Sequence, residues 1–370
     1  MTLQNSQTSI PLDLSRLSST LQKQLPFSAS LDCCVALAGD ASNRRYYRLH
    51  LSGAPVTSLI LMQLADPEGF KASEEAVGGK DREISELPFI NILKYWHTAG
   101  IPVPVLYFYD EPGGLLYLED FGDVTLAQAC HEASAATIER LYRQAIDVLV
   151  RIHAQASAPS HSSCLAFSRS FDVPLYLWEF DHFLEYGVVA RQGKPMCAED
   201  YLPIREEFQK IAEWLGGQPM VFTHRDFHSR NLMVESDRLG VIDFQDALMG
   251  PVTYDLASLL RDSYIALEEP LIDELLACYR EKMCEALPSS QHTAMYLNDA
   301  VTFRRLFDFT SIQRNLKAAG RFVYIDRVKG NPNFLASIPH TLMNVRANLT
   351  KYPQLNRLFQ HLSPYVSEWQ

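Results

Sequence analysis

The sequence has no surplus of basic residues. Its 370 residues include 33 Lys and Arg against 44 Asp and Glu, so the formal net charge is −11. A nucleic-acid binder normally carries basic clusters, and the one local run here, Arg44-Arg45 followed by Arg48, suits a single phosphate chain at most. Because a local pocket can override the net charge, we expect a nucleotide as a partner but not a nucleic acid.

Paired cysteines and long apolar runs are also missing. The seven Cys are an odd number without a CxxC pair, which argues against a disulfide framework or a zinc site. No apolar stretch approaches the length of a membrane span, and the first residues lack the pattern of a signal peptide. We expect a soluble, cytoplasmic protein with free thiols and no membrane partner, and we expect it to act as a monomer.

The apolar pattern changes character after residue 120. Before that point, short strand patterns alternate with turn residues, at 33–38, 46–51, 57–64, 103–109 and 115–119. After it, helical patterns dominate, one of them at about 292–319, with one short apolar hairpin at 232–242. We predict an α+β, bilobal protein-kinase-like fold: a small antiparallel-sheet N-lobe over residues 1–120, with a helix at 85–99, and a large helical C-lobe over residues 121–370.

The most informative segment contains H-x-D-x-x-x-x-N at His224, Asp226 and Asn231, followed by the hairpin and then Asp243. Phosphoryl transfer needs a carboxylate for the hydroxyl proton, metal ligands and phosphate contacts. We predict Asp226 as the catalytic base, and Asn231 and Asp243 as ligands of Mg²⁺, which prefers hard oxygen donors. The alternative, that these residues only pin a loop, is disfavoured because all the parts arrive in order after a strand-rich lobe.

The first predicted hairpin turn has the composition of a phosphate-covering loop. Its backbone N–H groups, one hydroxyl and an arginine fork can cradle anionic oxygens. The predicted nucleotide contacts here are Gly39, Ser42, Asn43, Arg44 and Arg45. Since the turn has a single glycine, an ordinary hairpin with surface arginines stays open as an alternative.

The last strand of the predicted N-lobe leads into the C-lobe through Leu118-Glu-Asp-Phe-Gly122. This is the position at which a kinase binds the adenine edge, so we predict nucleotide contacts at Glu119 and Phe121. For the acidic side chains, solvated residues at a strand end are an equally good interpretation.

Two acids follow Asp243. Asp246 is a candidate substrate contact, although a turn-forming role explains it as well. Asp255 stands at the start of a predicted helix, where we expect it to be the N-cap. Other histidines, such as His228, show no metal-ligand spacing and are expected in the core or on the surface.

These motifs resemble the aminoglycoside phosphotransferase/choline kinase superfamily, most closely its bacterial N-acetylmuramate/N-acetylglucosamine anomeric kinases of cell-wall recycling. The resemblance covers most of the chain, through Gly39–Arg48, Leu118–Gly122, His224–Asn231, Asp243–Asp255 and Gln313–Gly320. It implies a kinase that uses ATP and Mg²⁺ to phosphorylate the anomeric hydroxyl of an amino sugar during peptidoglycan recycling.

One departure from the kinase pattern concerns the third strand, where protein kinases carry a phosphate-binding Lys. That slot holds Met62, which we assign to the nucleotide site. Either Arg44, Arg45 or Arg48 replaces the missing cation, or the protein is an inactive nucleotide-binding pseudokinase. The amino-sugar kinase branch also lacks this Lys and keeps the paired arginines, which favours replacement.

The acceptor is less well specified than the chemistry. An aminoglycoside, choline or another amino alcohol would suit an acidic chain. An N-acetylated or carboxylate-bearing sugar would instead require a cation, and Arg230 and Arg314 are the candidates. The predicted substrate contacts are His224, Arg230, Asp246 and Arg314.

Overall fold

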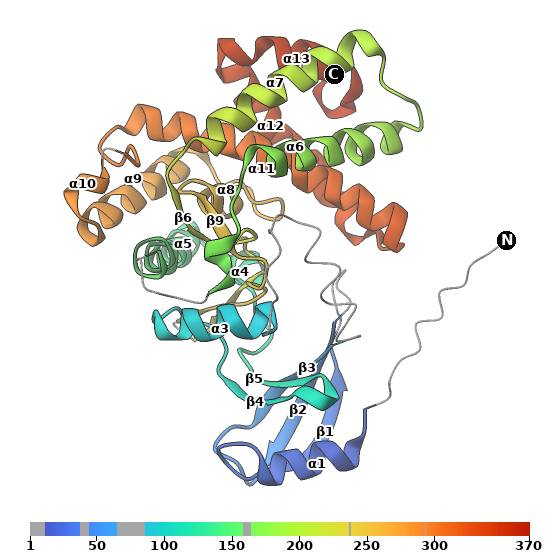
Figure 1. Ribbon diagram of the computed structural model, residues 1–370, viewed down its shortest axis with the longest axis vertical. Coiled ribbons are helices and arrows are strands. Elements are labelled where there is room, and N and C mark those ends of the chain that lie inside the picture. Colours follow the sequence, from blue (N-terminus) through green and yellow to red (C-terminus); the bar gives the residue numbers. More distant parts are fainter. Residues whose placement is uncertain (1–11, 38–43, 65–85, 158–163, 237, 293) are drawn as a thin grey trace, which may run out of the picture. The chain divides into compact units, whose positions relative to one another are not determined.

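The computed structural model describes residues 12–37, 44–64, 86–157, 164–236, 238–292 and 294–370. The chain divides into two compact units, which Figure 1 draws. Unit 1 comprises residues 1–77 and 104–121, and unit 2 comprises residues 78–103 and 122–370. Within the described ranges no helix is long and apolar enough to cross a membrane. All seven cysteines are free thiols, as expected.

Unit 1 is built on an antiparallel sheet of five strands in the order β1-β2-β3-β5-β4. The strands are β1 (Ser30–Ala36), β2 (Arg45–Ser52), β3 (Ser58–Gln63), β4 (Leu106–Asp110) and β5 (Leu115–Glu119). Each predicted strand is confirmed, with its ends shifted by a few residues.

Helix α1 (Leu14–Lys23) covers one face of this sheet (Figure 1). It begins after Asp13, whose carboxylate accepts hydrogen bonds from two backbone N–H groups of the first turn. Leu17 and Leu21 lie about one turn apart on the helix and are fully buried. They belong to the same core cluster as the sheet residues Leu49, Leu59 and Leu61.

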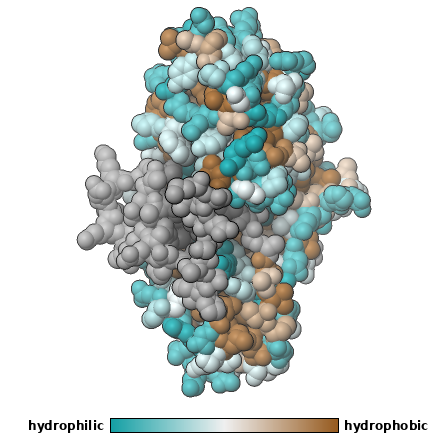
Figure 2. Space-filling view, turned by 90° about the vertical axis from the view of Figure 1, so that its right-hand side faces the viewer, coloured by the Kyte–Doolittle hydropathy of each residue, from teal (hydrophilic) through white to brown (hydrophobic). Residues whose placement is uncertain are grey.

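Unit 2 is mainly helical. Its helices are α3 (Pro88–Thr98), α4 (Leu126–Cys130), α5 (Ala135–Arg151), α6 (Val173–His182), α7 (Ala198–Gly216), α8 (Tyr254–Leu260), α9 (Glu269–Ala286), α10 (Ser289–His292), α11 (Ala300–Lys329), α12 (Ile338–Lys351) and α13 (Asn356–Leu362). Two small antiparallel sheets pair β6 (Met220–Thr223) with β9 (Leu248–Pro251) and β7 (Leu232–Glu235) with β8 (Arg238–Val241). On the face of unit 2 shown in Figure 2, hydrophilic side chains predominate, in keeping with the many charged residues.

The β7–β8 hairpin confirms the one predicted at 232–242, whereas the β6–β9 sheet was not predicted. The long helix α11 differs from the helix expected at 292–319. It begins after Asp299, which accepts hydrogen bonds from two backbone N–H groups, and it ends at Gly330, whose φ of 71° is left-handed. These two caps explain the shift in its boundaries.

Helix α3, expected in the small lobe, groups with unit 2. The reason is the ring of Trp96, which is fully buried in unit 2. Its centroid lies 5.5 Å from that of Phe222, 5.7 Å from that of His224 and 5.5 Å from that of Phe244. The helix is therefore anchored on the elements that carry the predicted catalytic motif.

Helix α11 crosses η4 (Phe183–Ala190), the π-helical continuation of α6, at very short range. A Cβ atom added to Gly320 would lie 2.7 Å from Cα and 3.1 Å from N of Phe183. Only glycine fits here, because the backbone of η4 cannot give way as a flexible side chain would.

We predict that Gly320→Ala lowers the free energy of unfolding by about 1–3 kcal/mol, because the new methyl group forces the two helices apart. Urea unfolding measures the loss. Gly217→Ala is the matched control, since its Cβ would meet nothing closer than the Glu213 carbonyl oxygen at 3.4 Å. Equal stability of the two variants would contradict the tight crossing.

Candidate active site

The loop after β6 carries the predicted motif, and its first residue, His224, is fully buried. The imidazole Nε2 donates to the carbonyl of Ile242 at 2.9 Å, and Nδ1 accepts from the backbone N–H of Asp226 at 3.3 Å. With both ring nitrogens used inside the protein, His224 ties the loop to the end of the β7–β8 hairpin. This geometry argues against the predicted substrate contact at His224.

Two fully buried carboxylates hold the backbone of this loop. Asp255 accepts hydrogen bonds from the N–H of His224 at 2.6 Å and of Arg225 at 3.0 Å. Asp262 accepts one from the N–H of Ser229 at 2.9 Å. Hydrogen bonds to ionised groups are stronger than neutral ones, so the loop has a well-defined conformation before any substrate binds.

The expected capping role of Asp255 is therefore wrong. Thr253 occupies the N-cap position of α8, and Asp255 lies in the first turn with its carboxylate on the loop. Arg225 has a φ of 79°, a left-handed conformation that non-glycine residues rarely adopt. Its hydrogen bond to Asp255 offsets the cost of that conformation.

The carboxylate of Asp226 is 38% exposed and faces a cation that the sequence analysis did not identify. Nζ of Lys317, on α11, lies 3.4 Å from Oδ1 of Asp226. Burial raises the pKa of Asp226, but nearby cations, Lys317 first among them, outweigh it and hold the pKa well below its usual range. Asp226 is therefore ionised at neutral pH.

Lys317 also lies 3.8 Å from Oε1 of Glu179, a fully buried residue of α6. The carboxylate of Glu179 accepts a hydrogen bond from Nε2 of Gln313 at 2.7 Å and pairs with the guanidinium of Arg225 at 3.2 Å. A buried carboxylate is tolerated only with such partners. Glu179 thereby links α6, α11 and the catalytic loop.

One sequence signal could have pointed to Lys317. It lies four residues after Gln313, so both side chains share one face of a helix, and both belong to the segment that carries the family resemblance. Glu179 offered no such signal, because its partner Gln313 is 134 residues away.

The oxygen atoms of Asn231 and Asp243 suit a hard metal ion. Nδ2 of Asn231 donates to the carbonyl of Asp226 at 3.0 Å, which leaves Oδ1 as the atom that can bind a cation. Asp243 is exposed, has a left-handed φ of 63° and accepts a hydrogen bond from Gln245 at 3.0 Å. One amide and one carboxylate are donors that Mg²⁺ accepts.

Three predicted substrate residues also lie in unit 2. The guanidinium of Arg230 stacks 3.7 Å from the ring centroid of Tyr264. Arg314 is 4% exposed, donates from Nε to Ser258 at 3.1 Å and has a buried Nη1 without a hydrogen-bond partner. Its positive charge is one of those that lower the pKa of Asp226. Asp246 is partly exposed, and its negative charge contributes to raising the pKa of Arg225.

His228 lies in the same loop, two residues after Asp226, and is half-buried. Burial lowers the pKa of His228 to about 4, so its ring is neutral at pH 7. Its Nδ1 is buried without a hydrogen-bond partner, and its ring meets that of Tyr264 edge-on, with centroids 5.3 Å apart.

Strand pairing in unit 1 separates the predicted nucleotide residues by face. Met62 lies directly opposite Tyr46, so both side chains point away from the α1 core that holds Leu61. By strand alternation Arg44, which is 8% exposed, shares the face of Met62, whereas Arg45 shares the face of Leu61. The remaining candidates, Gly39, Ser42 and Asn43, lie outside the described residues.

Asp120 holds one of the candidate cations. Its carboxylate accepts hydrogen bonds from Nε of Arg48 at 2.7 Å, from Nη2 of Arg48 at 3.1 Å and from the hydroxyl of Ser58 at 2.7 Å. The neighbouring Glu119 accepts from the backbone N–H of Val105 at 3.1 Å, and Phe121 is partly exposed. Arg48 is thus paired with Asp120, and Arg44 lies on the sheet face of Met62.

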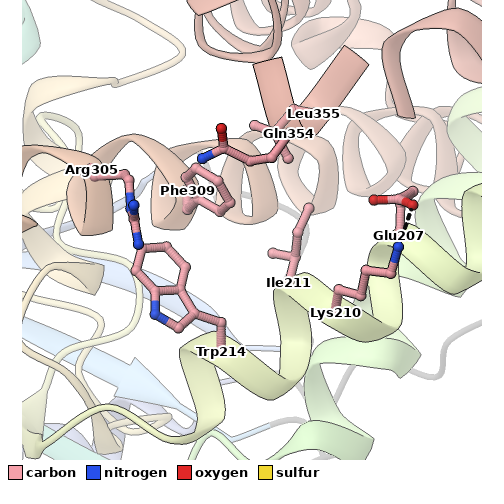
Figure 3. A pocket seen from close by; sticks show the side chains of 8 residues that line it. All are labelled: Glu207, Lys210, Ile211, Trp214, Arg305, Phe309, Gln354 and Leu355. Atoms are coloured by element: carbon pink, nitrogen blue, oxygen red, sulfur yellow. Dashed lines mark hydrogen bonds and ion pairs between the residues drawn. The ribbon is translucent and has the colours of Figure 1, made fainter. Parts of the chain in front are cut away.

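A hollow in unit 2 does not belong to this site. Figure 3 shows it between α7, α11 and the segment before α13, with the Arg305 guanidinium and the Trp214 indole close together. Arg305 lies 12 residues before Lys317 on α11, which corresponds to about 18 Å along the helix axis. The hollow therefore shares none of its lining residues with the loop after β6.

We predict that Asp255→Asn lowers kcat at least tenfold and costs about 1–3 kcal/mol of stability, because the amide keeps one acceptor oxygen and turns an NH2 donor toward the second loop N–H. Steady-state kinetics and thermal unfolding measure both effects. Asp299→Asn is the matched control, since Asp299 also accepts from two backbone N–H groups, but on an exposed helix end. A wild-type kcat in Asp255→Asn would contradict this role.

The chain is similar to several known proteins along most of its length. The chain is 30% identical to the N-acetylmuramate/N-acetylglucosamine kinase of Neisseria meningitidis serogroup B, over 90% of each protein. It is 27% identical to the protein of the same name from Pseudomonas aeruginosa, over 89% of this chain and 87% of that protein.

Among solved structures, choline kinase from Cryptosporidium parvum shares the fold, with a TM-score of 0.60 and 12% identity over 94% of this chain and all of that one. The model of the phosphotransferase enzyme family matches residues 34–289. The chain therefore belongs to the phosphotransferase enzyme family, whose members transfer phosphoryl groups to hydroxyls.

Proposed function

We propose that this phosphotransferase moves the γ-phosphoryl group of ATP to the anomeric hydroxyl of N-acetylmuramate and N-acetylglucosamine, in the recycling of cell-wall sugars. The observation that carries the chemistry is the partly exposed, ionised carboxylate of Asp226 on a loop held by Asp255 and Asp262. Support for the substrate comes from the relatives of that name, which match this chain over about nine-tenths of its length.

Asp226 acts as the acceptor for the hydroxyl proton. A carboxylate with a lowered pKa is a weak base, so it orients the hydroxyl in the ground state and takes the proton late. This suits phosphoryl transfer, which relies on positioning and charge stabilisation more than on a strong base. Lys317, 3.4 Å away, keeps Asp226 ionised and adds a positive charge beside the developing phosphate charge.

Asn231 and Asp243 hold Mg²⁺ through Oδ1 of the amide and through the carboxylate. The ion supplies positive charge that neutralises the phosphate oxygens. Asn231 is oriented for this role by its hydrogen bond to the carbonyl of Asp226, and the exposed Asp243 by that from Gln245.

Unit 1 contributes the nucleotide contacts. Arg44 and Met62, which share a sheet face, bind phosphate and base respectively, together with Gly39, Ser42, Asn43, Arg45, Glu119 and Phe121. Arg44 takes the place of the missing third-strand Lys.

The charges around Asp226 favour a neutral or anionic acceptor over a cationic one. The positive charges of Lys317, Arg225 and Arg314 all lower the pKa of its carboxylate. A cationic aminoglycoside, choline or amino alcohol would bring a further positive charge into this group and is therefore disfavoured. A pseudokinase has no chemical need to keep Asp226, Asn231 and Asp243 together in its sequence, so we favour an active enzyme that works as a monomer.

We predict that the protein, given ATP and Mg²⁺, phosphorylates both amino sugars and that ³¹P NMR finds the product phosphate on the anomeric oxygen. Asp226→Asn should lower turnover about 10³-fold or more, because the hydroxyl loses its proton acceptor. Nucleotide binding, followed by fluorescence titration, should stay near that of the wild type. Turnover of choline or an aminoglycoside in preference to both sugars would refute the proposed acceptor.

A second prediction concerns the metal. EDTA should abolish turnover, and Mg²⁺ should restore it, because both proposed ligands are hard oxygen donors. Asn231→Ala and Asp243→Ala should each raise the Mg²⁺ concentration needed for half-maximal rate at least tenfold. Gln209→Ala, on the outer part of α7, serves as the control and should leave this concentration unchanged.

A further inference from the structure

A row of polar and aromatic side chains runs along the junction of α6–η4 with α11 and begins beside Asp226. We call it the α6–α11 seam and define it by Glu179, His182 and Tyr186 on one side and by Lys317, Arg321 and Tyr324 on the other. On each side the residues are three or four positions apart, so each set occupies one face of its helix.

The aromatic part of the seam is a close cluster. The ring centroid of His182 lies 4.7 Å from that of Tyr186 and 5.3 Å from that of Tyr324, and the two tyrosine centroids are 5.1 Å apart. The guanidinium of Arg321 lies 4.7 Å from the centroid of Tyr324. Trp178, which is 50% exposed, stacks on the outer side of His182 at 5.5 Å.

Exposure increases along the seam with distance from Glu179. Gln313, which bonds Glu179, is fully buried; the Lys317 side chain is 16% exposed; and Arg321 is exposed. Since Lys317 touches Asp226, the seam connects the catalytic carboxylate with the surface of unit 2.

Polar atoms along the seam lack protein partners. Nε2 of His182 and Oε1 of Gln313 are both buried without a hydrogen bond. Buried polar groups are normally paired, so each of these two atoms needs a partner, which an ordered water or a ligand atom can supply.

The charges of the seam favour an anion. The charges of Lys317 and Arg321 both contribute to lowering the pKa of His182, after burial. The charge of Arg321 also contributes to lowering the pKa of Lys329, two turns further along α11. The opposing acids are Asp226 and Glu179, which both pair with Lys317, and the exposed Glu185. Glu179 also has Gln313 and Arg225 as partners, so the exposed Arg321 is the cation that an anion can reach.

We propose that the α6–α11 seam is the acceptor subsite, and that Lys317 and Arg321 select an amino sugar that carries a carboxylate over its neutral counterpart. This rests on the proposed function and deepens it. The sugar ring lies against the aromatic cluster, whose flat faces suit the apolar side of a pyranose. Arg321, stacked on Tyr324, keeps its guanidinium edge available for a bidentate contact with the carboxylate.

The test compares N-acetylmuramate, which carries a carboxylate, with N-acetylglucosamine, which is neutral. We expect Arg321→Gln to lower the ratio of kcat/KM for N-acetylmuramate to kcat/KM for N-acetylglucosamine about tenfold. The fall comes from a higher KM for N-acetylmuramate. Arg321→Lys should retain most of the preference, because it keeps the charge. Arg327→Gln is the matched control on the same helix, since Arg327 is 60% exposed and pairs only loosely with Asp326 at 3.5 Å.

An unchanged ratio in Arg321→Gln, or an equal fall in Arg327→Gln, would overturn the subsite. The proposed function fails separately, if the wild type turns over neither sugar. In that case, calorimetric titration of both sugars into the wild type and into Arg321→Gln tests the subsite. Tighter binding of N-acetylmuramate by the wild type, lost in Arg321→Gln, supports the subsite. Equal binding of the two sugars by the wild type refutes it.

Discussion

The buried carboxylate of Asp255 is the constraint on which the rest of the site depends. It accepts two adjacent backbone N–H groups at the head of the catalytic loop and forces Arg225 into a left-handed conformation. Because a buried charge without partners is very costly, the loop and Asp255 stabilise each other. Asp262 repeats the arrangement at Ser229, so the loop is held on both sides of Asp226.

A second chain of charges runs from Glu179 through Lys317 to Asp226. Glu179 is fully buried and has three partners, one of which is Arg225 of the loop itself. The same contacts that satisfy Glu179 therefore position Lys317 beside the carboxylate of Asp226. An ionised, well-positioned Asp226 fits a reaction in which orientation and charge stabilisation contribute more than proton abstraction.

Unit 1 departs from the kinase pattern in one respect, and its sheet suggests how the departure is accommodated. Met62 and Arg44 lie on the same face, away from the α1 core, whereas Arg45 lies on the core side. Arg48 is engaged by Asp120. The shared face of Arg44 and Met62 is in line with the proposal that Arg44 replaces the third-strand Lys.

The sequence by itself determined the strands of unit 1, the β7–β8 hairpin and the order of Asp226, Asn231 and Asp243, because these depend on local periodicity and on spacing within one loop. It did not reveal the loop-holding role of Asp255, which looked like a helix cap, or the place of Lys317 beside Asp226. Only the tertiary structure decided these, since they depend on the packing of α8 and α11 against the loop. Glu179 and Gln313 meet across 134 residues, and no local pattern encodes which face of one distant helix meets another.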